Sequence, residues 1–125
     1  MSTQDHTFDL IICGAGSSGL GLAYHLSRQK HQLRIALIDS NFSQSENKTW
    51  CFWDYTSIPE KQSIHHSWSR LSVQNQDISI EQSITAHEYY CIRNADYRST
   101  MLSLLKNDSR ISIIEDKIIK ICEDK

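Results

Sequence analysis

The sequence predicts an α/β fold that opens with a parallel βαβ unit and continues into a small antiparallel β insertion, a helix and further strands. Two observations predict the opening unit. All four glycines fall between Gly14 and Gly21, directly after an apolar run. A second apolar run then ends on an acidic residue, Asp39. A hydrophobic core is possible because 39% of the 125 residues are hydrophobic, and a chain of this length is expected to form one domain.

The first elements follow from the spacing of apolar residues. The continuous apolar stretch Leu10–Cys13 predicts a strand buried on both faces. Residues from Ser17 to about Gln29 predict a helix, and Leu33–Ile38 predicts a second strand. The residues expected on the buried face of that helix are Leu22, Leu26 and, beside them, Ala23.

The glycines form a Gly-x-Gly-x-x-Gly motif between this strand and this helix. Gly14 permits the tight turn, Gly16 lets a pyrophosphate approach the backbone, and Gly19 lets helix and strand pack closely. The helix N-terminus offers N–H groups and the positive end of the helix dipole to the phosphates. The alternative is a glycine-rich turn without a ligand. The expected cofactor-binding residues of the turn are Gly14, Ala15, Gly16, Ser17, Ser18 and Gly19.

Asp39 lies 20 residues after Gly19 and completes a Rossmann-like nucleotide site. Its carboxylate can accept hydrogen bonds from both hydroxyls of an adenosine ribose, and it would repel a 2′-phosphate. NADP is therefore disfavoured at this position, whereas NAD and FAD both remain open. An aromatic segment and a hairpin follow the second strand, an order similar to flavoproteins of the glutathione-reductase or aromatic-hydroxylase type.

The next segment is dense in aromatic residues. A polar loop over Asn41–Asn47 leads into a loop that carries Trp50 and Trp53 and ends before Pro59. These aromatic side chains could wall an apolar substrate cavity, or they could simply fill space as a core anchor.

The remaining chain predicts a hairpin, a helix and short strands. The helix is capped by Asn94 or Asp96 and runs to about Lys106. Its apolar side is expected to carry Met101, Leu102, Leu104 and Leu105. The expected strands are Leu71–Val73 and Ile78–Ile80 of the hairpin, Tyr89–Ile92, Arg110–Ile114 and Ile118–Cys122.

Three further polar residues are candidates for a functional role. Arg93 could reach a phosphate or the edge of a flavin, or it could be a surface arginine. His65 and His66 are interpreted as surface or hydrogen-bonded histidines, and no metal site is assigned. The four cysteines have no metal-ligand spacing and are expected to be small buried hydrophobes. They are Cys13, Cys51, Cys91 and Cys122.

Net charge and hydropathy exclude some classes of protein. The formal charge of −2 lacks the basic excess of a nucleic-acid-binding protein. No apolar run approaches the ~20 residues of a membrane span, and the N-terminus lacks a secretory pattern, so the cytoplasm is expected.

Two segments resemble bacterial lycopene cyclases. The first is the run from Phe8 to Gly19 with Leu22–Leu26 after it and Ile38-Asp39 at its close, which many FAD proteins share. The second is more restricted and is similar to that family's Asn-x-Arg/Lys-Thr-Trp-x-Phe signature. It reads Asn47-Lys48-Thr49-Trp50-Cys51-Phe52-Trp53. Residues from Tyr89 to Leu105 also resemble the family, less specifically.

The resemblance implies an isomerase. Lycopene cyclases close the ψ ends of lycopene into β-ionone rings, giving γ-carotene and β-carotene, by acid-initiated carbocation cyclisation without net redox change. The family uses bound reduced FAD, with NAD(P)H as reductant. Its acyclic carotenoid substrate lies in the bilayer, so peripheral contact with the inner face of the membrane is expected.

The resemblance also implies that the chain is an N-terminal portion. No segment matches the family's acidic catalytic motif, so no catalytic residue is assigned. The expected organisation is an incomplete FAD/NAD(P)-binding domain over 1–125 without a substrate domain: the βαβ unit over 8–39, aromatic loop and insertion over 40–92, and helix and strands over 93–125. The alternatives are an FAD-dependent monooxygenase, a polyprenyl or geranylgeranyl reductase, or an inactive nucleotide-binding remnant.

Overall fold

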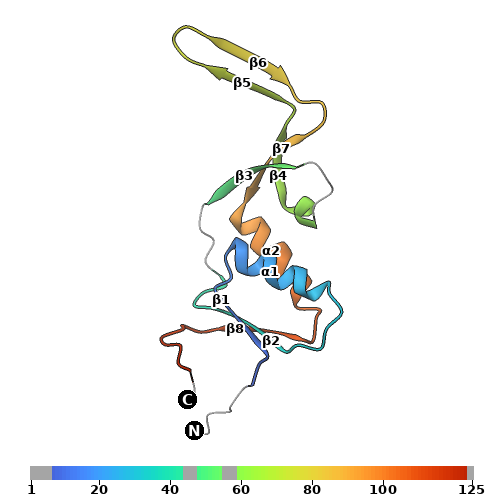
Figure 1. The fold of residues 1–125 in the computed structure, drawn as a ribbon, viewed down its shortest axis with the longest axis vertical. Coiled ribbons are helices and arrows are strands. Elements are labelled where there is room, and N and C mark those ends of the chain that lie inside the picture. Colours follow the sequence, from blue (N-terminus) through green and yellow to red (C-terminus); the bar gives the residue numbers. More distant parts are fainter. Residues whose placement is uncertain (1–6, 44–47, 55–58, 124–125) are drawn as a thin grey trace. The chain divides into compact units, whose positions relative to one another are not determined.

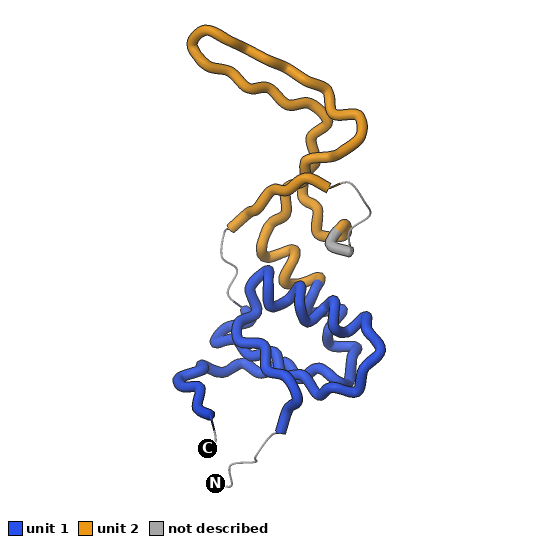
Figure 2. The backbone as a smooth tube through the Cα atoms, viewed as in Figure 1, with its two compact units in different colours: residues 1–44, 101–125 blue, residues 45–100 orange. Residues whose placement is uncertain are grey.

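The computed structural model describes residues 7–43, 48–54 and 59–123 (Figure 1). The chain divides into two compact units (Figure 2). The first unit comprises Met1–Gln44 and Met101–Lys125, and the second comprises Ser45–Thr100. The expectation about a secretory pattern rests on residues 1–6, and part of the expected polar loop falls on 44–47; both lie outside the described residues.

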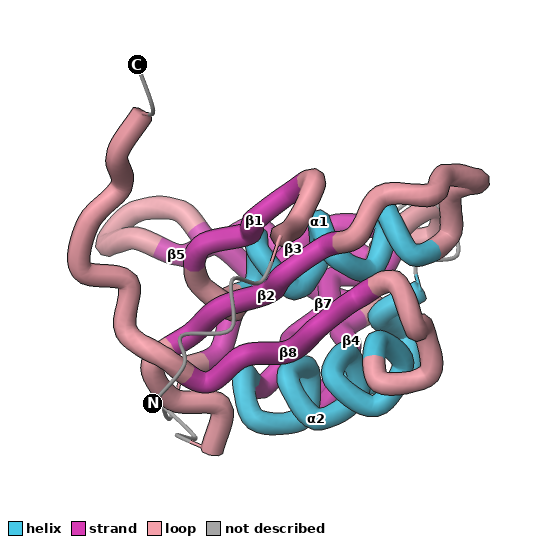
Figure 3. The backbone as a smooth tube through the Cα atoms, turned by 90° about the horizontal axis from the view of Figure 1, so that it is seen from below, coloured by secondary structure: helices cyan, strands magenta, loops and turns pink. Residues whose placement is uncertain are grey.

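The first unit contains the expected parallel βαβ arrangement. Strand β1 (Leu10–Cys13), helix α1 (Ser17–Ser27) and strand β2 (Ile35–Asp39) follow in order. Strand β8 (Ile111–Glu115) adds to the far side of β2, so the sheet has the order β1-β2-β8 with parallel pairing throughout (Figure 3). A parallel sheet places the carboxyl ends of its strands at one edge, which is where ligands of open α/β sheets bind.

Helix α1 covers one face of this sheet, and it does so through Leu20 and Ala23. The expected buried face was wrong in part, because Leu22 is exposed. Strand β1 was expected to be buried on both faces, but only Ile12 is buried and Ile11 is 52% exposed. Successive strand residues point to opposite faces, and among the described residues Ile11 has no helix over it that buries it.

The second unit contains an antiparallel sheet in the order β3-β7-β4. Its strands are β3 (Thr49–Asp54), β7 (Glu88–Arg93) and β4 (Ile64–Trp68), and the short 3₁₀ helix η1 (Pro59–Ser63) precedes β4. The aromatic segment was expected to be a loop, and this was wrong: it is strand β3. Its side chains alternate between half-buried and exposed, as a strand with one covered face requires.

The expected hairpin is confirmed as a separate two-stranded sheet of β5 (Arg70–Gln74) and β6 (Ser79–Ser83). Asn75 closes its turn, because its Oδ1 accepts hydrogen bonds from the backbone N–H groups of Asp77 at 2.9 Å and Ile78 at 2.7 Å. Asparagine is favoured in turns for this kind of local hydrogen bond.

The expected helix is confirmed as α2 (Asn94–Leu105). Tyr97, Met101 and Leu105 are buried, but the expected apolar side was wrong in part, because Leu104 is exposed and Leu102 is only half-buried. None of the described helices is long and apolar enough to cross a membrane.

The strand expected over Ile118–Cys122 was wrong, because residues 116–123 form no helix or strand. Ile119 is 90% exposed and Ile121 is 80% exposed, so neither side chain is buried by the described part of the chain. The expected burial of the cysteines was also wrong. Three are exposed and one, Cys91, is half-buried, and all four are free thiols.

Candidate functional site: the turn between β1 and α1

The turn after β1 needs glycine at Gly14 for a backbone reason. Gly14 has φ of +98°, in the left-handed region that other residues rarely adopt. Its N–H donates a 2.7 Å hydrogen bond to the carbonyl of Ile38, which ties the turn to the end of β2. The turn is therefore held at the carboxyl edge of the parallel sheet.

Gly19 is needed for packing. A Cβ atom at this position would collide with the carbonyl oxygen of Gly14 and lie 3.4 Å from Cγ2 of Ile12. Only glycine lets α1 approach β1 this closely, as the motif predicts. The same contact places α1 on the face of the sheet that carries Ile12.

Neither the backbone constraint of Gly14 nor the packing constraint of Gly19 applies to Gly16. Its φ of −74° is open to any residue, and a Cβ atom there would meet no atom within 4 Å. Nothing in the described residues therefore requires glycine at this position. The open space above Gly16 fits a group that approaches the backbone from outside the chain, as a pyrophosphate does in nucleotide sites.

The first turn of α1 has the features of an anion site. Gly16 is its N-cap, and no side chain caps the helix. No acidic residue lies in the first turn, and Ser17 and Ser18 are exposed. The first N–H groups of a helix lack partners within the helix, and the dipole makes this end positive. The sequence-predicted residues of the turn are thus brought together at one helix terminus.

Asp39 lies beside the same turn. Its Oδ2 accepts a 2.7 Å hydrogen bond from the N–H of Ala15, and its Oδ1 accepts one of 3.0 Å from the N–H of Asn41. These bonds hold the carboxylate at the carboxyl end of β2. Each carboxylate oxygen has two lone pairs, so a ribose hydroxyl can also donate to this group.

A cavity of about 220 Å³ opens next to Asp39 and Gly14. Sequence reasoning missed four of its lining residues, one directly after β2 and three after the carboxyl end of β8. The signal that could have found them is that β8 is a parallel neighbour of β2, so that both strands end at one edge. The missed lining residues are Ser40, Asp116, Lys117 and Ile118.

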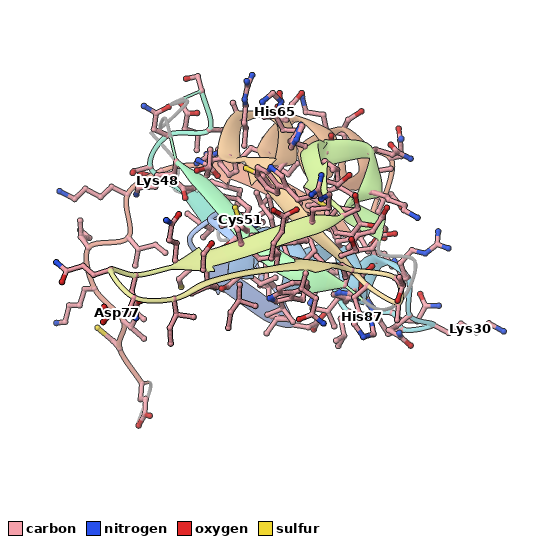
Figure 4. The ribbon with its side chains drawn as sticks, turned by 90° about the horizontal axis from the view of Figure 1, so that it is seen from above. Lys30, Lys48, Cys51, His65, Asp77 and His87 are labelled. Carbon is pink, nitrogen blue, oxygen red and sulfur yellow. The ribbon has the colours of Figure 1, made fainter. Side chains whose placement is uncertain are left out.

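Arg93 lies in the second unit, at the exposed end of β7. Its Nη2 lies 2.6 Å from Nε2 of His65, which is labelled in Figure 4. The guanidinium thus has a partner within its own unit, and its contact with a phosphate or flavin stays a prediction. Among the described residues no group of His, Cys, Asp or Glu is arranged to hold a metal ion.

The second unit holds an apolar cavity of about 420 Å³. Trp53 of the aromatic segment lines it together with side chains of the hairpin and the residues that follow it. Its apolar lining residues are Trp53, Leu71, Val73, Ile80, Ile84 and Ala86. His87 lies at the same cavity, at the end of the hairpin away from Asp77 (Figure 4).

The turn, the helix terminus and the Asp39 carboxylate lie together at one edge of the sheet, and two solved structures share the fold. A mutant of PqsL from P. aeruginosa matches with a TM-score of 0.73 and 16% identity over 96% of this chain. A second PqsL structure, described as a probable FAD-dependent monooxygenase from Pseudomonas aeruginosa, matches with a TM-score of 0.68 and 14% identity over 94% of this chain. At this identity the likeness shows the fold alone.

The family match is more specific. The family model described as lycopene cyclase protein matches residues 9–125, and the chain belongs to this family. Thiamine thiazole synthase of Eremothecium gossypii is 54% identical over 33 residues, which are 26% of this chain and 10% of that protein. The chain spans 36% and 35% of the two PqsL chains, about a third of their length.

Proposed function

We propose that this chain is the nucleotide-binding portion of an FAD-dependent lycopene β-cyclase. The match of residues 9–125 to the lycopene cyclase family carries the proposal. The substrate is lycopene or another acyclic carotenoid, whose ψ ends become β-ionone rings through a carbocation without net oxidation. The catalytic acid is supplied by a segment outside these 125 residues.

The residues of the β1–α1 turn would hold the nucleotide of the flavin. Gly14 shapes the turn, Gly16 would leave room for the pyrophosphate, and the first N–H groups of α1 would donate hydrogen bonds to it. Asp39 would accept hydrogen bonds from the ribose. When bound, FAD kept reduced by NAD(P)H would supply negative charge that stabilises a carbocation.

The second unit supports an apolar substrate. The cavity beside Trp53 is lined mainly by aliphatic and aromatic side chains, as a hydrocarbon ligand requires. An aromatic face can also stabilise a nearby cation. Because a C40 carotenoid lies in the bilayer, the protein would act in the cytoplasm at the inner face of the membrane, in peripheral contact with it.

Lycopene conversion in a carotenoid-producing bacterial host tests this function. The 125-residue chain and a version extended in frame beyond Lys125 are expressed side by side, and pigments are separated by chromatography. We expect γ-carotene and β-carotene from the extended version only. Unchanged lycopene from a soluble, flavin-loaded extended version would contradict the proposal.

An FAD-dependent monooxygenase is the second candidate, because a solved PqsL structure with this fold is described as a probable FAD-dependent monooxygenase. The product separates the candidates. A cyclase gives an isomer of lycopene, a monooxygenase adds an oxygen atom, and a polyprenyl reductase adds two hydrogen atoms. Mass spectrometry of the pigment therefore distinguishes all three.

A further inference from the structure

Two cysteines lie opposite each other on neighbouring strands of the antiparallel sheet in the second unit. Cys51 of β3 and Cys91 of β7 are directly opposite in the antiparallel register. Cys51, which is labelled in Figure 4, is exposed, Cys91 is half-buried, and both are free thiols. They lie 40 residues apart in the sequence, so only the strand pairing brings them together.

The hydrogen-bond pattern shows which kind of pair they form. The N–H of Asn94 donates to the carbonyl of Lys48 at 2.8 Å, which makes this a hydrogen-bonded pair. Hydrogen-bonded and non-hydrogen-bonded pairs alternate along an antiparallel ladder. Counted along the ladder from the Lys48–Asn94 pair, Thr49–Arg93 is the next pair and Cys51–Cys91 is the third. An odd number of steps leads to a pair of the other kind. The cysteines therefore form a non-hydrogen-bonded pair.

This kind of pair has the spacing of a disulfide. Its Cα atoms are ~4.5 Å apart and its side chains are closer than in the other kind. Disulfides span Cα separations of ~4.4–6.8 Å. The two thiols also interact, since a hydrogen bond with Cys51 joins burial in raising the pKa of Cys91.

We propose that Cys51 and Cys91 are a redox modification site, which a low-molecular-weight disulfide such as glutathione disulfide converts into a cross-strand disulfide. The exposed thiolate of Cys51 attacks the oxidant and releases one glutathione thiol. The thiol of Cys91 then loses its proton and displaces the second glutathione. The protein gives up two electrons and two protons, and the oxidant becomes two molecules of glutathione.

The bond would join two strands that carry candidate functional residues. β3 holds the Thr49-Trp50 part of the family signature, and β7 ends at Arg93. A disulfide would prevent these strands from separating. Oxidation of this site would therefore stabilise the sheet without changing its register.

The test uses the full chain with Cys13→Ser and Cys122→Ser, so that only the proposed pair remains. The folded protein is incubated with glutathione disulfide, and intact mass and free thiols are followed. We expect the loss of two hydrogen atoms, the loss of both free thiols, and a tryptic fragment linking the two strands. Stable glutathione adducts or dimers in place of the internal bond would overturn the proposal.

A matched control keeps two thiols on the same face at a different spacing. Thr49→Cys with Cys51→Ser places the thiols diagonally, where Cα atoms are ~7–8 Å apart. That separation is too long for a disulfide. We expect glutathione adducts and no internal bond in this variant. Equal internal oxidation of both proteins would mean that strand register does not govern the reaction, and it would overturn the proposal. Circular dichroism of both proteins before oxidation verifies that the sheet is intact.

Discussion

Three glycines of one motif serve three different purposes. Gly14 has a positive φ, Gly19 touches the backbone of Gly14, and Gly16 has neither constraint. The fold therefore requires glycine at two positions of the motif, whereas at the third position it would accept another residue. Substitutions at these positions separate folding from ligand binding.

Gly16→Val should weaken FAD binding without unfolding the chain. Its side chain enters open space, so stability should change little, but it occupies the place that a pyrophosphate needs. We expect the dissociation constant for FAD to rise about tenfold or more, which is about 1.4 kcal/mol or more. Flavin fluorescence titration measures it, with Gly16→Ala as the smaller control. Unchanged affinity would remove Gly16 from the phosphate site.

Gly19→Ala, in contrast, should destabilise the fold itself. Its methyl group collides with the carbonyl oxygen of Gly14, so α1 must shift away from β1. Overpacking of this kind costs about 1–3 kcal/mol of unfolding free energy. Urea denaturation followed by circular dichroism measures the loss. A variant as stable as the parent chain would mean that the helix and strand do not approach so closely.

Asp39→Ala should weaken both the turn and FAD binding. The carboxylate accepts the N–H of Ala15 and is positioned to accept ribose hydroxyls. Loss of charge-assisted hydrogen bonds should reduce the binding free energy of FAD by about 1.5–3 kcal/mol. Calorimetric titration measures it, and Asp39→Asn, which keeps one acceptor oxygen, should lose less. An FAD affinity equal to that of the parent chain would contradict the ribose role.

At the scale of elements, Arg110 joins the end of α1 to the start of β8. Its guanidinium donates to the carbonyl oxygens of Ser27 at 2.8 Å, Gln29 at 3.0 Å and His31 at 3.0 Å. It also forms an ion pair with Asp108 at 2.7 Å. The planar fork of arginine can make these bonds at once, whereas lysine cannot. This contact fixes the turn that leads into the third parallel strand.

Arg110→Lys should therefore destabilise the chain in a pH-dependent way. The hydrogen bond from Arg110 lowers the pKa of Asp108, so the pair stabilises the fold above the ordinary aspartate pKa. This stabilisation is lost as pH falls through the lowered pKa. We expect the variant to be less stable than the parent at pH 7 and the difference to shrink at pH 2. Urea midpoints at both pH values measure it. A difference that is constant with pH would contradict the ion pair's role.

At the scale of the whole molecule, the chain exposes apolar side chains that a net charge of −2 does little to keep apart. The most exposed of them are Ile119, Ile121 and, on the hairpin, Val73. Such side chains favour association with other apolar surfaces. The whole chain is therefore expected to self-associate at high concentration.

Ile119→Ser with Ile121→Ser should reduce that association. Both side chains are almost fully exposed, so their replacement removes apolar surface without opening a cavity. We expect lower light scattering at equal concentration and unchanged circular dichroism. Lys120→Ser in the same segment is the control, and it should not reduce scattering. Scattering that stays at the level of the parent chain would locate the association elsewhere.

The local sequence pattern was sufficient to predict an element where residues close together in the sequence decide its structure. The strand Leu10–Cys13, the helix from Ser17 and the hairpin turn at Asn75 were all predicted and confirmed. It was insufficient for Ile118–Cys122, which reads as a strand by composition but lacks a partner strand among the described residues. A strand exists only when its backbone groups are paired, and composition does not supply the pair.

The sequence by itself determined the βαβ unit, the glycine motif, the acid after β2 and the resemblance to the lycopene cyclases. These depend on residues close together in the chain, whose backbone preferences and spacing are local. Only the tertiary structure decided that Gly16 faces open space and that Asp39 holds Ala15. It alone also placed Cys51 opposite Cys91, because strand register is set by pairing between distant segments.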